Sequence, residues 1–441
     1  MKRTFDVVVI GSGFGGSVSA LRLREKGYSV AVLEAGKRFR DKDFPKTSWR
    51  ISKFLFVPKV GLYGIQRIHV LPDVLVLAGA GVGGGSLVYA NTLYQPGDQY
   101  FTDKQWASIT NWKEELEPWY DQARRMLGVT ENPYFSNSDK AMKEAAEGWG
   151  KYLEKEKLDK KTHDLGFKIY CSFGNGYQAT KNENYKAIIL QAAKTLSSRY
   201  NPKVGLIRSW DHHKDVWDFP VIIDNLMNLE MLFRATTWTG DSSYYKIAYS
   251  HAFLTMKNHY RPDISCFHVV DYNPNTGAIQ KKVTHQGASD ASSWARGQAW
   301  GLYGYTMIYR ETKDPQFLNF AHKIADYIFS HPNMPADLIP YWDFNAPNIP
   351  NEERDVSAAT ILASGLLELA ELDKSKAKKY RSYADKILEN LQNEKYRTNQ
   401  SPFFLQHSVG GKPNKVEIDV PIVYADYYYV EALKRKLSYK R

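Results

Sequence analysis

The first 34 residues alternate between apolar and polar stretches in the order strand, turn, helix, strand. A continuous β-branched run over 5–10 is typical of a strand covered on both faces, and a helical pattern follows over 17–26. A second apolar run over 29–33 ends at Glu34. This order predicts the beginning of a βαβ unit.

The turn after the first predicted strand carries three glycines with the spacing of a dinucleotide-binding loop. Gly11 permits the tight turn, Gly13 lets a pyrophosphate approach the backbone, and Gly16 lets the helix pack on the strand. Glu34 stands where a carboxylate accepts from a ribose hydroxyl. Because strand, turn, helix, strand and acid occur in order, we expect a dinucleotide site.

From about residue 149 the pattern changes to successive helices joined by loops rich in glycine, proline and tryptophan. The segment 239–248 parallels 312–321, and Tyr380 with Ala384 forms a looser third copy. In the two closer copies an aspartate can cap the helix, and in all three an aromatic residue and an alanine lie one turn apart. Repeated helical hairpins predict an α-solenoid or a closed α/α barrel, and the long aromatic loops favour the barrel.

Composition limits the possible classes of function. The 441 residues, 43% hydrophobic and 24% charged, are typical of a soluble globular protein of two domains or one large toroidal domain. Two cysteines predict neither a disulfide framework nor a metal site, and the N-terminus shows no signal peptide, which favours a cytoplasmic location. A net charge of +11 favours anionic partners, but the lysines are scattered, so we expect no nucleic acid and no membrane as partner. The oligomeric state stays open.

One carboxylate in the helical part stands in an apolar environment. Asp224 lies within the run 221–233, which we expect to be helical, with Pro220 in the first turn and Asp218 as the cap. Burial raises the pKa of a carboxyl group toward a value useful for donating a proton at neutral pH. The alternative is a core aspartate satisfied by hydrogen bonds.

A second candidate is the run 293–303. On a helix, Arg296, Trp300 and Tyr303 share one face, and Trp294 with Gln298 shares an adjacent face. A guanidinium among aromatic rings suits an anionic sugar, and the same stripe suits helix packing equally well.

Residues 1–148 resemble the glucose-methanol-choline flavin oxidoreductases, particularly the cholesterol-oxidase-like branch. The resemblance rests on the glycine turn, on 34–36, and on a second glycine cluster at 79–91. It implies contacts with FAD from Gly11, Gly13, Gly16, Glu34, Gly83, Gly84, Ser86 and Asn91. Nothing after residue 150 matches the substrate domain of that family, so we expect no hydride transfer.

Residues 149–441 resemble glycoside hydrolase family 88, the unsaturated glucuronyl hydrolases. The motifs lie at 163–167, 171–176, 219–225, 285–287, 293–300, 355–359, 417–421 and 424–428. The resemblance implies an α/α six-hairpin barrel acting on unsaturated uronate-containing oligosaccharides, the products of polysaccharide lyases. It implies catalytic roles for Asp224 and Asp164, and substrate contacts from Trp210, His268, Gln286, Arg296 and Trp300.

The same resemblance implies a mechanism that needs no cofactor or metal. Asp224 protonates C4 of the enol ether, water adds at C5, and the resulting hemiketal opens and expels the sugar, while an ionised Asp164 holds ring hydroxyls or steadies the positive charge. The family barrel has helices before residue 163, where this chain has the flavoprotein-like part. We therefore expect an α/β Rossmann-like FAD-binding fragment over 1–148, followed by an incomplete all-α barrel over 149–441.

An incomplete barrel should leave apolar faces uncovered around Asp164 and near 424–429. Two alternatives to the hydrolase are an FAD-dependent oxidoreductase acting on an alcohol or sterol, and an inactive fusion of two truncated enzymes.

Overall fold

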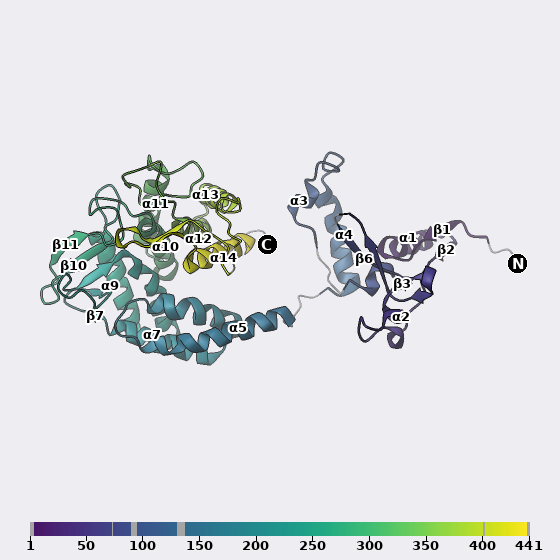
Figure 1. Ribbon diagram of the computed structural model, residues 1–441, viewed down its shortest axis with the longest axis horizontal. Helices are drawn as coiled ribbons and strands as arrows, with labels where there is room; N and C mark the ends of the chain where they lie inside the picture. The colour runs from purple at the N-terminus through teal and green to yellow at the C-terminus, as the bar shows by residue number, and fades with distance from the viewer. Residues whose placement is uncertain (1–3, 73, 90–94, 130–136, 400–401, 439–441) are drawn as a thin grey trace. The chain divides into compact units, whose positions relative to one another are not determined.

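The computed structural model describes residues 4–72, 74–89, 95–129, 137–399 and 402–438. Its contacts divide the chain into two compact units, Met1–Tyr134 and Phe135–Arg441 (Figure 1). The division lies ahead of the boundary expected at 148/149, because α5 (Asn137–Leu153) contacts η4 (Glu154–Leu158) and η5 (Gly166–Gly174) in the second unit.

The first unit begins with the expected strand, helix and strand: β1 (Val7–Ile10), α1 (Phe14–Glu25) and β2 (Val30–Leu33). β1 and β2 pair in parallel, with Val7 opposite Val30. Gly11 has φ +91°, and a Cβ on Gly16 would lie 2.0 Å from the Gly11 carbonyl oxygen, so both positions require glycine.

The expectation that the first strand is covered on both faces is wrong. Ile10 is 87% exposed and Val8 is 51% exposed. The cause is that, among the described residues, β1 and β2 form a sheet of only two strands, so no further strand or second helical layer covers them.

The remainder of the first unit consists of short elements. Antiparallel pairs form between β3 and β4 and between β5 and β6. In chain order the elements are η1 (Asp41–Asp43), α2 (Ile51–Phe54), β3 (Phe56–Val57), η2 (Pro58–Val60), β4 (Leu62–Tyr63), β5 (Gln66–Val70), β6 (Leu75–Gly79), η3 (Gly84–Leu87), α3 (Asp98–Phe101) and α4 (Trp112–Leu127).

The second unit alternates helices of an inner and an outer set. The inner set is η5, a π-helical segment, then η6 (Ile223–Asn228) leading into α8 (Leu229–Thr239), α10 (Ala295–Thr312), α12 (Val356–Leu372) and α14 (Val423–Ser438). The outer set is α7 (Glu183–Ser197), α9 (Ser242–Asn258), α11 (Pro315–Ser330) and α13 (Ala377–Asn390), and the short α6 (Asn175–Thr180) follows η5. Each outer helix packs on its inner neighbour, and α10, α12 and α14 lie side by side (Figure 1).

The repeat read from the sequence corresponds to the outer helices. Asp241 caps α9 by accepting from the Ser243 amide at 2.8 Å, and Asp314 caps α11 by accepting from the Gln316 amide at 3.0 Å. The aromatic and alanine pairs of α11 and α13 are fully buried. The predicted capping and packing of these helices are therefore confirmed.

Small antiparallel sheets connect the helices. The first pairs β7 (Tyr200–Asn201) with β8 (Leu206–Ile207). The second has three strands, β9 (Pro220–Ile222), β10 (Val269–Tyr272) and β11 (Ile279–Val283), with β10 in the middle. The third pairs β12 (Ser408–Gly411) with β13 (Val416–Val420), and η7 (Lys412–Asn414) lies between these two strands in the chain.

The helix expected to start at residue 221 begins later. Val221 pairs with Val270 in the sheet, and Pro220 lies on the edge strand β9, where its missing N–H is tolerated. Asp218 is not a cap, because its carboxylate accepts from the Gln280 side chain at 2.9 Å. Asp224 therefore lies in the first turn of η6, directly after a strand.

Charged side chains bridge four of the inner helices. Glu368 of α12 pairs with Arg310 of α10 at 2.5 Å and also with Arg435 of α14, all three in the C-terminal halves of their helices. Arg310 in turn pairs with Glu230 in the first turn of α8 at 2.5 Å.

One face of α14 is uncovered. Val423, Val430 and Leu437, spaced seven residues apart, are 71%, 51% and 66% exposed. Val423 and Val430 flank the cluster at 424–429, so apolar surface is exposed there as expected, although Tyr428 and Tyr429 themselves are buried. Beside Asp164, Leu165 is buried, whereas Leu158 is 59% exposed. The apolar surface lies on the outer side of α14, where no described outer helix follows it.

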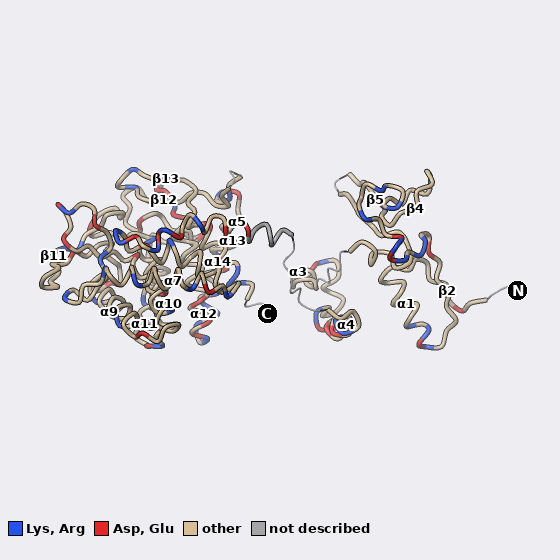
Figure 2. Tube along the Cα trace, turned by 90° about the horizontal axis from the view of Figure 1, so that it is seen from below, with Lys and Arg blue, Asp and Glu red and all other residues tan. Residues whose placement is uncertain are grey.

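Basic and acidic residues alternate along the trace without gathering in a stripe (Figure 2). Within the described ranges, no helix is both long enough and apolar enough to cross a membrane.

Candidate active site

Two predicted site residues of the second unit lie at the N-terminal ends of inner helices, Asp224 in η6 and Arg296 in the first turn of α10. Two residues that were not predicted lie at corresponding ends, Tyr424 in the first turn of α14 and Asp355 as the N-cap of α12. Inner helices that run in the same direction bring these short segments to one end of the unit. The sequence separates them by as much as 200 positions.

Asp224 has the surroundings of a proton donor. The pKa of Asp224 is raised to about 7, chiefly by burial and to a smaller extent by the Asp164 carboxylate, while Arg296 acts in the opposite direction. A carboxyl group with a pKa near 7 is largely protonated below neutral pH and exchanges a proton readily at neutral pH.

His268 faces Asp224 as a neutral imidazole. Its Nδ1 accepts from the backbone amides of His285 and Gln286, each at 3.1 Å, so the ring proton resides on Nε2. Burial lowers the pKa of His268 well below its usual value, which keeps the ring uncharged. The Nε2 atom lies 3.7 Å from Oδ2 of Asp224, beyond a hydrogen bond.

The second carboxylate, Asp164, is held by its neighbours and open to solvent. Its Oδ1 lies 3.1 Å from His163 Nε2, and its Oδ2 accepts from the Thr162 hydroxyl at 3.1 Å. The other ring nitrogen of His163 lies 2.7 Å from the Ser209 carbonyl oxygen, next to Trp210. With 41% of its side chain exposed, Asp164 can meet a ligand.

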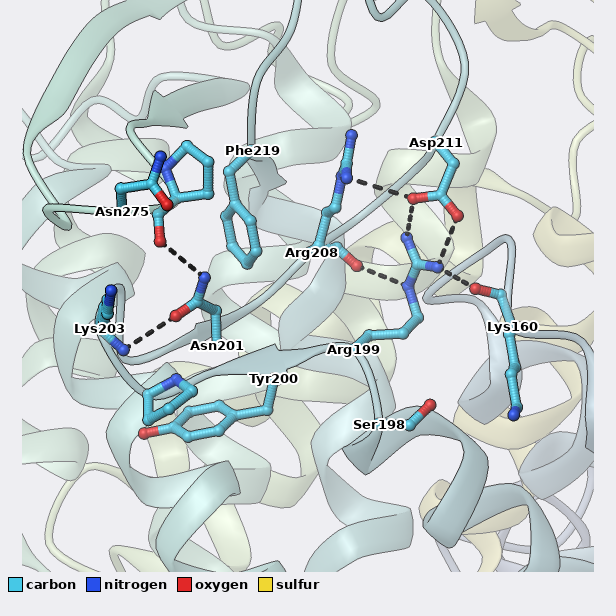
Figure 3. Close-up of a pocket in the computed structure, with 12 residues that line it drawn as sticks. Lys160, Ser198, Arg199, Tyr200, Asn201, Lys203, Arg208, Asp211, Phe219 and Asn275 are labelled. Atoms are coloured by element: carbon cyan, nitrogen blue, oxygen red, sulfur yellow. Dashed lines mark hydrogen bonds and ion pairs between the residues drawn. The ribbon is translucent and has the colours of Figure 1, made fainter.

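Arg199 ties together the segments that carry Asp164 and Trp210 (Figure 3). Its guanidinium binds both carboxylate oxygens of Asp211 at 3.0 Å, donates to the Arg208 carbonyl at 2.9 Å, and also donates to the Lys160 carbonyl. The Arg199 side chain is 5% exposed. A cavity of about 660 Å³ is lined in part by this clamp, through Lys160, Arg199, Arg208 and Asp211.

Arg296 is enclosed between rings and backbone. Its guanidinium lies over Trp294 and Tyr424, with 4.5 and 5.4 Å to the ring centroids, and donates to Asp355 at 2.8 Å. It also donates to the Gly410 carbonyl at 2.6 Å, which accepts from the Gln286 side chain at 3.0 Å as well. The Gly410 carbonyl, on strand β12, therefore connects Arg296 with Gln286, both of which are predicted substrate contacts.

Several buried polar atoms at this end have no hydrogen-bond partner among the described residues. Those that belong to predicted site residues are Trp210 Nε1, Asp224 Oδ2, His268 Nε2 and Trp300 Nε1. Buried polar atoms are normally hydrogen-bonded, so a group of unpartnered donors beside a carboxyl group indicates a bound polar ligand. No group of three metal-ligating side chains occurs in the described part of the chain.

One residue of the helix face predicted over 293–303 does not belong to the site, and the site contains residues that were not predicted. Tyr303 lies away from the site, since it stands at the middle of α10 and its hydroxyl donates to Glu431, at the middle of α14, at 2.9 Å and accepts from Arg435 at 2.9 Å. For Tyr303, the helix-packing alternative is correct. The positions of His163, Asp355 and Gly410 were not foreseen as part of the site, although an aspartate directly before the helical run 356–372 is a recognisable cap.

The first unit contains a glycine-lined turn that fits a pyrophosphate. A Cβ on Gly13 would meet no atom within 4 Å, so its backbone is open to approach, and a Cβ on Gly84 would lie 2.6 Å from the Gly13 Cα. The Glu34 carboxylate, however, accepts from the Ser12 amide at 2.9 Å and from the Gly36 amide at 2.9 Å. Both of its oxygens already have partners.

The second glycine cluster lies against the first. Gly83 donates to the Ser12 hydroxyl at 3.1 Å, and the Ser86 hydroxyl donates to the Gly83 carbonyl at 3.0 Å. Asn91 lies outside the described residues.

Comparisons with known proteins give two families, and the hydrolase match begins within the first unit. Residues 98–435 match the model of Glycosyl Hydrolase Family 88, and residues 6–44 match an FAD binding domain. An unsaturated glucuronyl hydrolase of Formosa agariphila is 50% identical over 302 residues, which are 68% of this chain and 75% of that protein. A cholesterol oxidase of Mycobacterium tuberculosis is 62% identical over 150 residues, which are 34% of this chain and 26% of that protein.

A solved structure agrees with the second unit. The crystal structure of an unsaturated glucuronyl hydrolase specific for heparin aligns with a TM-score of 0.63 at 47% identity, covering 65% of this chain and 77% of that one. By contrast, the chain spans about a quarter of the cholesterol oxidase. The family model covers well over half of the chain, and the chain therefore belongs to glycosyl hydrolase family 88.

Proposed function

We propose that the second unit is an unsaturated glucuronyl hydrolase, which hydrates the enol ether of a 4,5-unsaturated uronic acid at the end of an oligosaccharide. The observation that carries the proposal is Asp224, whose side chain is 15% exposed and whose pKa is raised to about 7, in a unit where the buried donors Trp210 Nε1 and His268 Nε2 have no hydrogen-bond partner among the described residues. The proposed substrate is a uronate-containing oligosaccharide, and its anionic group suits the buried cation Arg296.

In the proposed reaction, the protonated carboxyl of Asp224 gives its proton to C4 of the double bond. Positive charge then develops at C5 and the ring oxygen, where the carboxylate of Asp164 stabilises it. Water adds to C5 and returns a proton to the Asp224 carboxylate. The resulting hemiketal opens and releases the remaining sugar, so Asp224 ends in its initial state without any cofactor.

We propose further that this unit is an α/α barrel that lacks part of its ring, and that the two sequence resemblances meet near 148/149. The succession of inner and outer helices supports the first part, and the uncovered face of α14 marks the place of the missing helices. The ion network between the inner helices supports retention of the barrel wall that carries Asp224.

The test is loss of the absorbance of the conjugated uronate when purified protein is added to an unsaturated glycosaminoglycan disaccharide. We expect absorbance to fall with wild type and to stay constant with Asp224→Asn, which keeps the shape but cannot cycle a proton. A matched control is Asp326→Asn, which changes an exposed carboxylate on α11. If wild type is inactive, or the Asp224→Asn protein turns over normally, the proposal is wrong.

For the first unit we propose that flavin binds weakly or not at all. The glycine turn can approach a pyrophosphate, but both oxygens of Glu34 are used within the protein, and the strands beside the turn are largely exposed. When bound, FAD would supply hydride-transfer chemistry, and Gly11, Gly13 and Gly84 would hold its phosphates. Stoichiometric flavin absorption in the purified protein, with reduction by an alcohol, would instead support the oxidoreductase alternative.

A further inference from the structure

Arg296 and Asp355 form an ion pair that is wholly removed from water. The Arg296 side chain is 3% exposed and the Asp355 side chain is not exposed at all, and their nearest atoms lie 2.8 Å apart. The two residues come from different inner helices, α10 and α12. A buried charge is costly unless it is paired, so each residue depends on the other.

Asp355 uses its two carboxylate oxygens for different tasks. Oδ1 accepts from the Ser357 hydroxyl at 2.5 Å and from the Ser357 amide at 3.1 Å, which caps α12. Oδ2 accepts from Arg296 alone among the described residues. A cap needs only one oxygen and no charge, since serine and asparagine cap helices as well as aspartate does. The second oxygen and the negative charge therefore require a separate explanation.

The charged and titratable groups that face Asp224 make the charge of Asp355 relevant to it. Arg296 lowers the pKa of Asp224, against burial and Asp164, which raise it. The other groups around Asp224 are uncharged, and they come from three segments: Cys266 and His268 before β10, Trp300 on α10, and Tyr424 on α14. Arg296 is thus the cation that most lowers the pKa of Asp224, and the counter-ion of Arg296 decides how far that pKa is lowered.

We propose that Asp355 is a positioning residue that offsets the charge of Arg296, so that Arg296 can hold an anionic sugar while Asp224 keeps its proton. Without the carboxylate of Asp355, an unbalanced guanidinium stabilises the ionised form of Asp224 and removes the acid at neutral pH. The Gly410 and Val409 carbonyls and the two flanking rings keep the guanidinium in place, so it cannot move away from Asp224 when Asp355 is changed.

The effect of Asp355 on catalysis rests on the proposed function, but the charge balance between Asp355 and Arg296 can be tested without it. The midpoint of protonation of Asp224 can be followed through its side-chain carboxyl 13C resonance, assigned by comparison with the Asp224→Asn protein. This measurement needs no turnover, so an inactive enzyme would refute the proposed function and leave the charge balance open to measurement. The alkaline limb of the pH profile of kcat provides a second readout in an active enzyme.

Two variants remove the charge and keep a capping group: Asp355→Asn and Asp355→Ser. We expect both to lower the midpoint of Asp224 by about one pH unit or more, which is the usual effect of an unscreened opposite charge nearby. The kcat profile should shift to lower pH by the same amount. The matched control is Ser357→Ala, which removes a capping hydroxyl without changing charge and should leave the midpoint unaltered. If Asp355→Asn and Asp355→Ser lower thermal stability but leave the midpoint within about 0.3 of wild type, Asp355 is a cap only and the proposal is overturned.

The double variant Arg296→Gln/Asp355→Asn tests the proposal independently of the single variants. It can be used even if the single variants do not fold, because it leaves no buried charge unpaired. If the two charges offset each other, the midpoint of Asp224 in the double variant stays close to wild type. A midpoint raised by about one pH unit or more would show that Arg296 acts on Asp224 without compensation from Asp355, contrary to the proposal.

Discussion

The Nε2 atom of His268 lies 3.7 Å from Oδ2 of Asp224, and neither atom has a hydrogen-bond partner among the described residues. Because Nδ1 of the same ring accepts from two backbone amides, Nε2 carries the proton and points toward the carboxyl group. A ligand oxygen can therefore accept a hydrogen bond from Nε2 of His268 while it contacts the carboxyl group of Asp224.

Replacement of His268 by asparagine should separate these two tasks. The asparagine oxygen can take the place of Nδ1 as acceptor for the His285 and Gln286 amides, while the donor toward Asp224 is lost. We expect kcat/KM to fall roughly tenfold or more, about the value of one hydrogen bond. Steady-state kinetics on an unsaturated disaccharide provides the measurement. An unchanged kcat/KM in a folded His268→Asn protein would remove His268 from substrate binding.

The buried Asp224 should make stability depend on pH. Its pKa is raised to about 7 in the folded protein, so between its unfolded value of 3.8 and about 7 the folded state binds more protons. Wild type therefore loses stability as pH rises through this range, by at most about 1.4 kcal/mol per pH unit, whereas Asp224→Asn does not.

Thermal melts of both proteins from pH 4 to pH 8 provide the check. The difference in Tm between the asparagine protein and wild type should grow toward pH 7 and then level off. A difference that is constant over this range would mean that Asp224 is not shielded from water.

The ion network between the inner helices should contribute to stability. Glu368 lies between Arg310 and Arg435 and is 8% exposed, so Glu368→Ala removes one partner from each of two partly buried cations. Arg310 keeps Glu230 and Glu311, and Arg435 keeps Glu431. We therefore expect a loss of about 1.5–3 kcal/mol in the free energy of unfolding, the value of hydrogen bonds to charged groups. The control Asp326→Ala breaks an exposed pair with Lys379 and should cost less than about 1 kcal/mol. Denaturant unfolding measures both, and equal losses would contradict the assignment.

Some of this organisation could be read from the sequence and some could not. The caps Asp241 and Asp314 were predictable because each capping bond joins residues only two positions apart. The start of the helix near Asp224 was not, because Pro220 suits both a helix start and an edge strand, and only the distant β10 decides between them. Tyr303 shares a helix face with Arg296, but 18 residues of α10 span the unit from the site to the ion network. The periodicity of the sequence predicts which face of a helix a residue occupies. The contacts with partner helices decide whether that residue lies at the site or in the ion network.

The uncovered face of α14 should bind hydrophobic dyes. Replacement of Val423, Val430 and Leu437 by serine together should reduce dye fluorescence while changing the free energy of unfolding by less than about 0.5 kcal/mol per site, as is usual for exposed positions. Ile279→Ser, on the edge strand β11, is a control with a single exposed apolar side chain. A large loss of stability in the triple variant would instead indicate that this face is covered in solution.

The clamp around Arg199 has a consequence for how the hydrolase can be joined to other sequences. Asp164 is held to the part of the chain that follows it, through His163 to Ser209 and through Lys160 to Arg199. None of these bonds involves the chain before residue 160, although Lys168 on η5 pairs with Glu156 and Asp159. A leader of different ancestry attached upstream of η4 therefore leaves the bonds that hold the second carboxylate in place, whereas exchange of η4 itself would remove the partners of Lys168.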